Sequence, residues 1–123
     1  MILADTSIWV EYLRNGLPAM KAALDGGQIL IHPFIVAEIA LGSLYNRKKR
    51  LEELDALQRV KVAQLAEVRR MIEAHALYSK GIGLTDAHLL ASCLLSLGVK
   101  LWTRDTSLEA VARSLGVHWS SAP

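Results

Sequence analysis

The hydrophobic positions of the chain fall into short apolar runs that alternate with longer segments of helical periodicity. The short runs are rich in Ile, Leu and Val and predict buried strands at residues 1–4, 28–32, 99–103 and 117–119. Helical spacing predicts helices at residues 7–15, 18–25, 84–97 and 107–115, and another that begins at Pro33. Strands that alternate with helices indicate an α/β fold with a parallel sheet covered on both faces.

Residues 47–79 have the periodicity of one long helix, but their composition argues against it. The stretch RVKV at residues 59–62 contains β-branched residues in alternation. We therefore predict two helices on either side of this stretch. Gly81 and Gly83 are expected to end the second of them.

The bulk composition indicates one cytoplasmic domain. We expect it to span residues 1–123, because 123 residues are the size of an ordinary domain and 52% of them are hydrophobic. No apolar stretch is long enough to span a bilayer, and no basic segment of a signal peptide precedes the first apolar residues. The single cysteine, Cys93, lies in an apolar helix and is expected to be a buried structural thiol.

The charge balance does not by itself indicate a nucleic-acid-binding protein. There are 14 Lys and Arg against 12 Asp and Glu, a net charge of +2. The basic residues are clustered, however, at Arg47–Arg50 and at the Arg69-Arg70 pair. Each cluster is either a solvated helix surface or a local contact for phosphates.

The tripeptide Asp-Thr-Ser occurs twice, at residues 5–7 and 105–107, each time between a predicted strand and a predicted helix. Ligand sites of open parallel sheets lie outside the carboxyl ends of the strands. Asp5 and Asp105 should therefore lie at the same edge of the molecule. Either aspartate could serve only as a helix cap, but the Thr and Ser that follow are also available caps, so we expect that the aspartates are not needed as caps.

A third acid, Glu38, stands in the apolar stretch PFIVAEIALGS at residues 33–43. Its neighbours three and four residues away carry no charge: they are Phe34, Ile35, Leu41 and Gly42. A carboxylate in such a helix is expected to lose hydration, which would raise its pKa unless a cation compensates. The alternative is a protonated or solvent-reaching side chain with no function.

A fourth acid, Asp86, follows Thr85 at the start of a predicted helix, where it suits the helix dipole and Thr85 is a plausible N-cap. If the sheet gathers all four acids, they repel one another. Two carboxylates about 5 Å apart repel by about 3 kcal/mol at an effective dielectric constant near 20. A hard divalent cation, Mg²⁺ or Mn²⁺, would compensate this repulsion through oxygen ligands.

Zinc is a poorer candidate than magnesium or manganese. The four histidines lack the spacing of zinc ligands, and only one cysteine is present. We interpret the histidines as structural or surface residues: His32, His75, His88 and His118.

Four segments of the chain, in order, carry a resemblance to a known family: ILADTSIWVEYL (2–13), FIVAEIALG (34–42), GIGLTDAHLLAS (81–92) and LWTRDTSLEAVA (101–112). Together they resemble the PIN-domain ribonucleases, and within that group the VapC-type toxins of toxin–antitoxin pairs. The resemblance covers essentially the whole chain. It implies a three-layer α/β/α sandwich around a mostly parallel sheet of four to five strands.

The resemblance also implies roles for individual residues. It makes Asp5, Glu38, Asp86 and Asp105 the catalytic and metal-binding acids of an endoribonuclease that depends on Mg²⁺ or Mn²⁺. Ser7 and Thr103 match supporting hydroxyl positions, and Arg104 matches a position that is often basic. Some members carry one more acid shortly after the last, where Thr106 and Ser107 stand here. The number of metal ions, one or two, therefore stays open.

The partners implied are an RNA substrate, a cognate VapB-type antitoxin that blocks the site, and a second copy of the chain in a homodimer. Apolar residues near the acids are either core or part of an antitoxin groove: Trp9, Tyr12, Leu13, Ile39, Leu41, Leu44 and Tyr45. One competing interpretation is a catalytically inactive PIN-like module that binds RNA or protein. Another is a signalling domain with a phosphorylated aspartate, which would need a lysine beyond a late strand, whereas Lys100 is predicted inside one.

Overall fold

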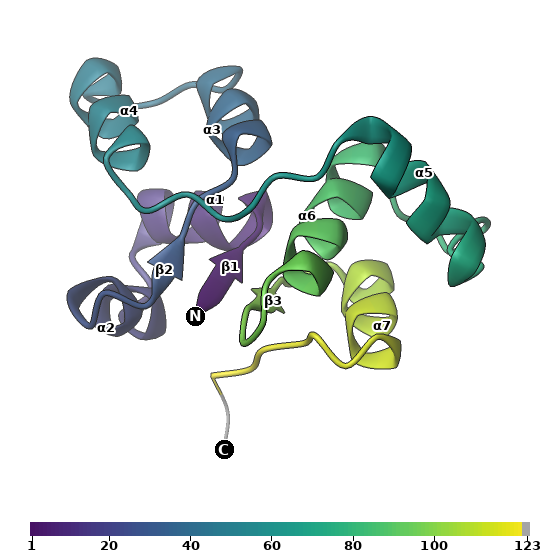
Figure 1. Ribbon diagram of the computed structural model, residues 1–123. Coiled ribbons are helices and arrows are strands. Elements are labelled where there is room, and N and C mark those ends of the chain that lie inside the picture. The colour runs from purple at the N-terminus through teal and green to yellow at the C-terminus, as the bar shows by residue number, and fades with distance from the viewer. Residues whose placement is uncertain (122–123) are drawn as a thin grey trace.

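A three-stranded parallel sheet lies at the centre of this computed structural model, which describes residues 1–121 (Figure 1). The strands are β1 (Ile2–Ala4), β2 (Ile29–Leu30) and β3 (Lys100–Trp102), in the order β2-β1-β3. Leu3 of β1 is in register with Leu30 on one side and with Leu101 on the other. The predicted α/β class and parallel sheet are therefore confirmed.

Helices follow each strand and separate it from the next, as the alternating pattern predicted. Their bounds are α1 (Thr6–Asn15), α2 (Pro18–Asp25), α3 (Pro33–Ala40), α4 (Arg47–Asp55), α5 (Leu65–Ala74), α6 (Leu84–Leu95) and α7 (Thr106–Ser114). The break predicted at RVKV is present, because α4 ends at Asp55 and α5 begins at Leu65. Among residues 1–121, no helix combines the length and the apolar character that a membrane crossing requires.

The prediction of four to five strands was wrong for the described residues. Residues 59 and 118 extend the sheet at its two edges, but each forms only a single parallel bridge, Ile31 with Arg59 and Leu101 with His118. At the first edge the reason is local, since Pro33 begins α3 directly after His32 and leaves one residue free to pair. At the other edge, the predicted strand at residues 117–119 forms only the His118 bridge.

The helix before α6 also ends earlier than predicted. We expected Gly81 and Gly83 to terminate it, but α5 ends at Ala74. Ala76 and Ser79 both have positive φ angles, 52° and 60°, which a right-handed helix does not allow. The chain from His75 to Gly83 is consequently a connection that brings α6 back to the sheet.

The core is formed by the strands and by the helices that cover them. Leu3 and Leu101 are fully buried, and Leu89 and Leu90 of α6 pack into the same cluster. Cys93 is buried there too, and its burial raises the pKa of the thiol to about 12, so it is inert at neutral pH. The prediction of a structural thiol is confirmed.

The order of the strands determines where a site is expected. The chain passes from β1 to β2 on one side of β1 and later returns to β3 on the other side. Because such connections are right-handed, the reversal places successive helices on opposite faces and opens a crevice at the carboxyl ends of the strands. The segments that leave these ends carry Asp5, Asp105 and the helix with Glu38.

Candidate acidic site at the carboxyl ends of the strands

The four predicted acids lie at the same edge of the sheet and interact electrostatically. Burial raises the pKa of Asp86, and the negative charges of Asp105, Asp5 and Glu38 raise it further. The charges of the other three acids, which come from three separate segments, therefore reach Asp86. The structure thus brings together the four residues that the sequence singled out.

Asp5 is the most constrained of the four. It is 5% exposed, and its Oδ1 accepts hydrogen bonds from Ser7 Oγ at 2.5 Å and from the Ile8 amide at 3.2 Å. Thr103 Oγ1 donates to the other oxygen, Oδ2. Burial raises the pKa of Asp5, while the hydrogen bonds from Ser7 and Thr103 act in the opposite direction.

The expectation that the aspartates are not needed as helix caps was wrong. Asp5 is the N-cap of α1, and Asp105 is the N-cap of α7, with Oδ1 accepting from the Leu108 amide at 3.0 Å. The first residue of each Asp-Thr-Ser turn takes the extended backbone conformation that a cap requires. The caps hold both carboxylates at the carboxyl ends of β1 and β3.

Asp86 is also held by the backbone, and Thr85 is not the cap that we expected. Gly83 is the N-cap of α6, and its amide donates to Asp86 Oδ2 at 3.1 Å. Asp86 therefore lies in the first turn of the helix, where a negative charge is favoured by the helix dipole. One oxygen is used by the cap, and Oδ1 has no hydrogen bond to another residue in the part of the chain described.

Glu38 departs from the expectation of a desolvated carboxylate. Its side chain is exposed, although Ile35 and Ile39 on the same helix are buried. Thr6 Oγ1 donates a hydrogen bond to Glu38 Oε1 at 2.6 Å, which joins α3 to the first Asp-Thr-Ser turn. This role of Thr6 was not predicted, although its place in the repeated tripeptide was a signal for it.

The two supporting hydroxyls connect the turns after β1 and β3. Ser7 Oγ accepts from the Arg104 amide at 3.1 Å, and Thr103 Oγ1 accepts from the Asp105 amide at 3.0 Å. Both hydroxyls also donate to Asp5. This network fixes the two turns against each other, and it leaves the Arg104 side chain exposed beside the acids.

Gly81 allows the segment that precedes α6 to approach the first turn of α7. Gly81 has φ +79°, and a Cβ on residue 81 would lie 3.3 Å from Ser107 Oγ, tighter than ordinary contact. Only glycine meets both requirements without strain. The close approach brings the segment that begins with Gly81 and leads to Asp86 alongside the turn that carries Asp105.

The donor set matches the chemistry of a hard divalent cation. None of the four carboxylates forms an ion pair with Lys, Arg or His within residues 1–121, whereas four ion pairs occur elsewhere in that range. As the side chains lie, no three of the acids, histidines and cysteine in the described chain converge into a ready cation cluster. Oxygen donors, shared negative charge and missing counter-cations nevertheless fit Mg²⁺ or Mn²⁺.

The raised pKa values predict how the metal-free protein responds to pH. A carboxyl whose pKa is raised in the folded state binds protons more tightly there, so it favours folding at low pH and loses this effect as pH rises through the folded value. For Asp5 and Asp86, both raised above 3.8, we expect the thermal midpoint in EDTA to rise on acidification as pH falls from 7 through the raised values toward 3.8.

Thermal melts across this range, with and without Mg²⁺, check the prediction. Asp86→Asn should reduce the dependence, because one of the two groups no longer titrates. Asp25→Asn, on the exposed end of α2, is the matched control. A midpoint that is independent of pH in the metal-free protein contradicts the raised pKa values of Asp5 and Asp86.

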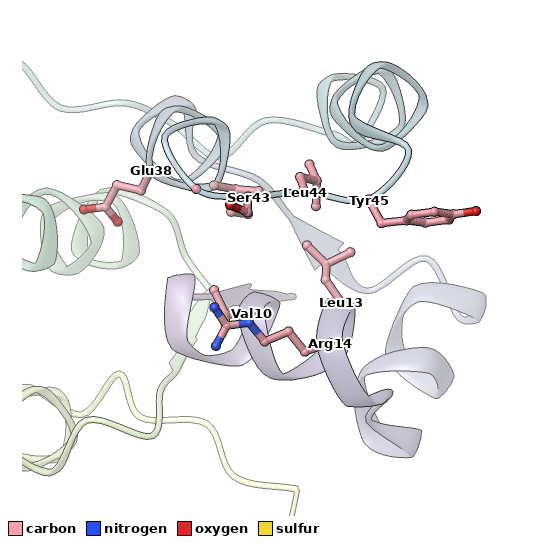
Figure 2. Close-up of a pocket in the computed structure, with 9 residues that line it drawn as sticks. Val10, Leu13, Arg14, Glu38, Ser43, Leu44 and Tyr45 are labelled. Carbon is pink, nitrogen blue, oxygen red and sulfur yellow. The ribbon is translucent and has the colours of Figure 1, made fainter.

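A groove leads away from the acids along α1 and α3 (Figure 2). It has a volume of about 370 Å³ and is lined by Val10, Leu13, Arg14, Glu38, Ile39, Gly42, Ser43, Leu44 and Tyr45. Glu38 lies at one end, and its carboxylate points away from Leu44 and Tyr45 at the other. Tyr45 is 90% exposed, whereas Trp9 and Ile39 belong to the core.

Comparison with known proteins agrees with the sequence resemblance. The PIN domain family matches residues 2–114. The chain therefore belongs to the PIN-domain family. It is 38% identical over 117 residues to "Ribonuclease VapC32" from Mycobacterium tuberculosis strain CDC 1551 / Oshkosh, and equally to the protein of that name from strain ATCC 25618 / H37Rv. The match covers 95% of this chain and 94% of each relative, so the predicted resemblance to VapC-type proteins is confirmed.

Proposed function

We propose that the protein is an endoribonuclease that depends on Mg²⁺ or Mn²⁺ and acts as the toxin of a type II toxin–antitoxin pair. The observation that carries the proposal is that the charges of Asp5, Glu38 and Asp105 all act on Asp86, while none of the four acids has a cationic partner within residues 1–121. Its relatives are ribonucleases by name, and the match spans nearly the full length of each. We place the protein in the cytoplasm, where a ribonuclease toxin would meet its RNA substrate.

The residues divide into those that would hold the cation and those that orient them. Asp5, Glu38, Asp86 and Asp105 supply carboxylate oxygens, while Ser7 and Thr103 fix the orientation of Asp5. A bound divalent ion stabilises negative charge on a phosphodiester and makes water a better nucleophile near neutral pH. Glu38 is exposed and held by one hydrogen bond, so it is suited to orient or deprotonate the attacking water.

Attack of water on phosphorus in line with the 3′-oxygen breaks the P–O3′ bond. The products are a 5′-phosphate and a 3′-hydroxyl, and no side chain forms a covalent bond. Arg104 and the exposed basic residues of α4 and α5 are candidates for contacts with flanking phosphates, and such contacts make binding weaken as salt rises. The signalling alternative is disfavoured because Lys100 is the first residue of β3, at its amino end.

The test is cleavage of folded, structured RNA by purified protein free of antitoxin, with Mg²⁺, Mn²⁺ or EDTA. We expect cleavage that requires metal and leaves 5′-phosphates. Products with 2′,3′-cyclic phosphates that form in EDTA would contradict the mechanism. RNA binding without cleavage by a metal-loaded protein would support the inactive binding module instead.

The groove of Figure 2 is the proposed binding surface for the antitoxin. Leu13, Leu44 and Tyr45 offer an apolar lining beside Arg14 and Glu38, so a segment that fills it would also cover the approach to the acids. An exposed aromatic ring such as Tyr45 is a typical anchor of protein interfaces. A homodimer of the free toxin remains part of the proposal.

Tyr45→Asp should weaken capture of the cognate antitoxin by roughly 30-fold or more, the effect of losing an interface anchor of about 2 kcal/mol. The thermal midpoint should not change, because Tyr45 is 90% exposed. Tyr78→Asp, at an exposed tyrosine outside the groove, is the matched control. The two variants are compared by co-purification with tagged antitoxin, and equal retention would exclude Tyr45 from the interface.

A further inference from the structure

Two buried histidines lie between the helices that carry Glu38 and Asp86. His32 is fully buried, and its Nδ1 accepts a hydrogen bond from the Phe34 amide at 3.0 Å, which makes it the N-cap of α3. His88 is 4% exposed and lies on α6, two residues after Asp86. The proposed function uses neither residue, although both belong to elements that position its acids.

The rings of His32, Phe34 and His88 form one cluster, referred to below as the ring cluster. The centroids of Phe34 and His88 are 4.5 Å apart, those of His32 and Phe34 are 5.1 Å apart, and those of the two histidines are 6.2 Å apart. These are the separations of rings in direct contact. The cluster therefore joins the first turn of α3 to the first half of α6.

The contact between the two helices depends on ring packing and not on histidine polarity. His88 Nδ1 and His32 Nε2 are buried and have no hydrogen-bond partner within residues 1–121. Burial lowers the pKa of His32 to about 4, and the neighbouring His88 and Arg59 act in the same direction. The His32 ring is thus neutral at pH 7 and packs against the other two rings as an uncharged group.

The position of the cluster connects this packing to the acids. Glu38 lies six residues after His32 on the helix that His32 caps, and Asp86 lies half a turn before His88. The negative charge of Glu38 acts on Asp86 across the space between these helices. A change in the distance between α3 and α6 would therefore change the separation of Glu38 and Asp86 directly.

We propose that the ring cluster positions Glu38 against Asp86, and that His88 is a positioning residue for metal binding and RNA cleavage. This inference rests on the proposed function. Because His88 acts through its ring, a phenylalanine at this position should preserve the positioning role, and an alanine should not. Displacing catalytic groups by about 1 Å can cost on the order of a hundredfold in rate, and loss of a supporting contact costs roughly 10–100-fold in metal affinity.

The test compares His88→Ala and His88→Phe with the wild type, and His75→Ala is the control at an exposed histidine. Mn²⁺ affinity is measured by electron paramagnetic resonance on metal-free protein without RNA, and kcat and KM are measured with RNA. We expect His88→Ala to bind Mn²⁺ about 10–100-fold more weakly and to lose kcat with KM nearly unchanged. His88→Phe and His75→Ala should remain within about threefold of the wild type.

Thermal melts separate positioning from folding. His88→Phe removes a buried nitrogen without a partner, so its midpoint should equal or exceed that of the wild type. A His88→Ala protein that folds and keeps wild-type Mn²⁺ affinity and kcat overturns the positioning role alone. A His88→Phe protein that is as impaired as His88→Ala overturns the role of the ring. A wild type that neither binds Mn²⁺ nor cleaves RNA overturns the proposed function, and this inference with it.

Discussion

Replacement of Glu38 by glutamine is expected to reduce RNA cleavage by roughly a hundredfold to a thousandfold, the scale of losing one preorganised electrostatic group. Stability of the metal-free protein should be unchanged or higher. Glu38 is exposed, and a glutamine Oε1 still accepts the hydrogen bond from Thr6. The loss of its charge also relieves the repulsion with Asp86. Single-turnover cleavage and thermal melts in EDTA measure the two effects.

Glu52→Gln on α4 is the matched control, since it is an exposed helical glutamate outside the acidic site. It should leave both cleavage and the thermal midpoint unchanged. The combination of lost activity and kept stability distinguishes a functional from a structural role for Glu38. A large drop in the midpoint of Glu38→Gln would assign the residue to the structure instead.

Asp5→Ala is expected to abolish cleavage and to destabilise the protein. Asp5 caps α1 and accepts the hydroxyls of Ser7 and Thr103 at a buried position. Loss of a cap and of a partner for a buried hydroxyl together cost about 2–4 kcal/mol. Urea unfolding in EDTA measures this loss.

Asp5→Asn separates the two consequences. An asparagine oxygen can still accept from the Ile8 amide, so the cap is retained, whereas the charge needed for a cation is lost. We expect it to be as inactive as Asp5→Ala but closer to the wild type in stability. An Asp5→Ala protein as stable as the wild type would show that the hydrogen bonds around Asp5 contribute little to folding.

The sequence predicted the elements of this fold well because each had a clear local signal. Pro33 opens α3, RVKV interrupts the helical stretch, and the middle of the apolar helix α6, from Ala87 to Cys93, is buried. The edges of the sheet were not predictable in the same way. Whether residues 117–119 become a strand or a single bridge depends on how long they stay beside Leu101, which local propensity does not determine.

For the candidate site, the sequence predicted which acids lie near one another but not their local geometry. The repeated Asp-Thr-Ser and the isolated Glu38 identified the acids, because charge without a partner is unusual beside buried strands. Which of three consecutive polar residues caps a helix depends on backbone angles, so the caps at Asp5 and Asp105 were missed. The exposure of Glu38 was missed because periodicity shows which side of α3 is apolar but not what covers the other side.

The central claim is that four carboxylates from separate segments form one divalent cation site. The most direct measurement is a Mn²⁺ titration of the metal-free protein, followed by electron paramagnetic resonance, for the wild type and for Asp86→Asn. Asp86 is chosen because the charges of the other three acids act on it. We predict one or two bound ions in the wild type and loss of that binding in the variant. A wild type that binds no Mn²⁺, or a variant that binds it equally well, would contradict the account.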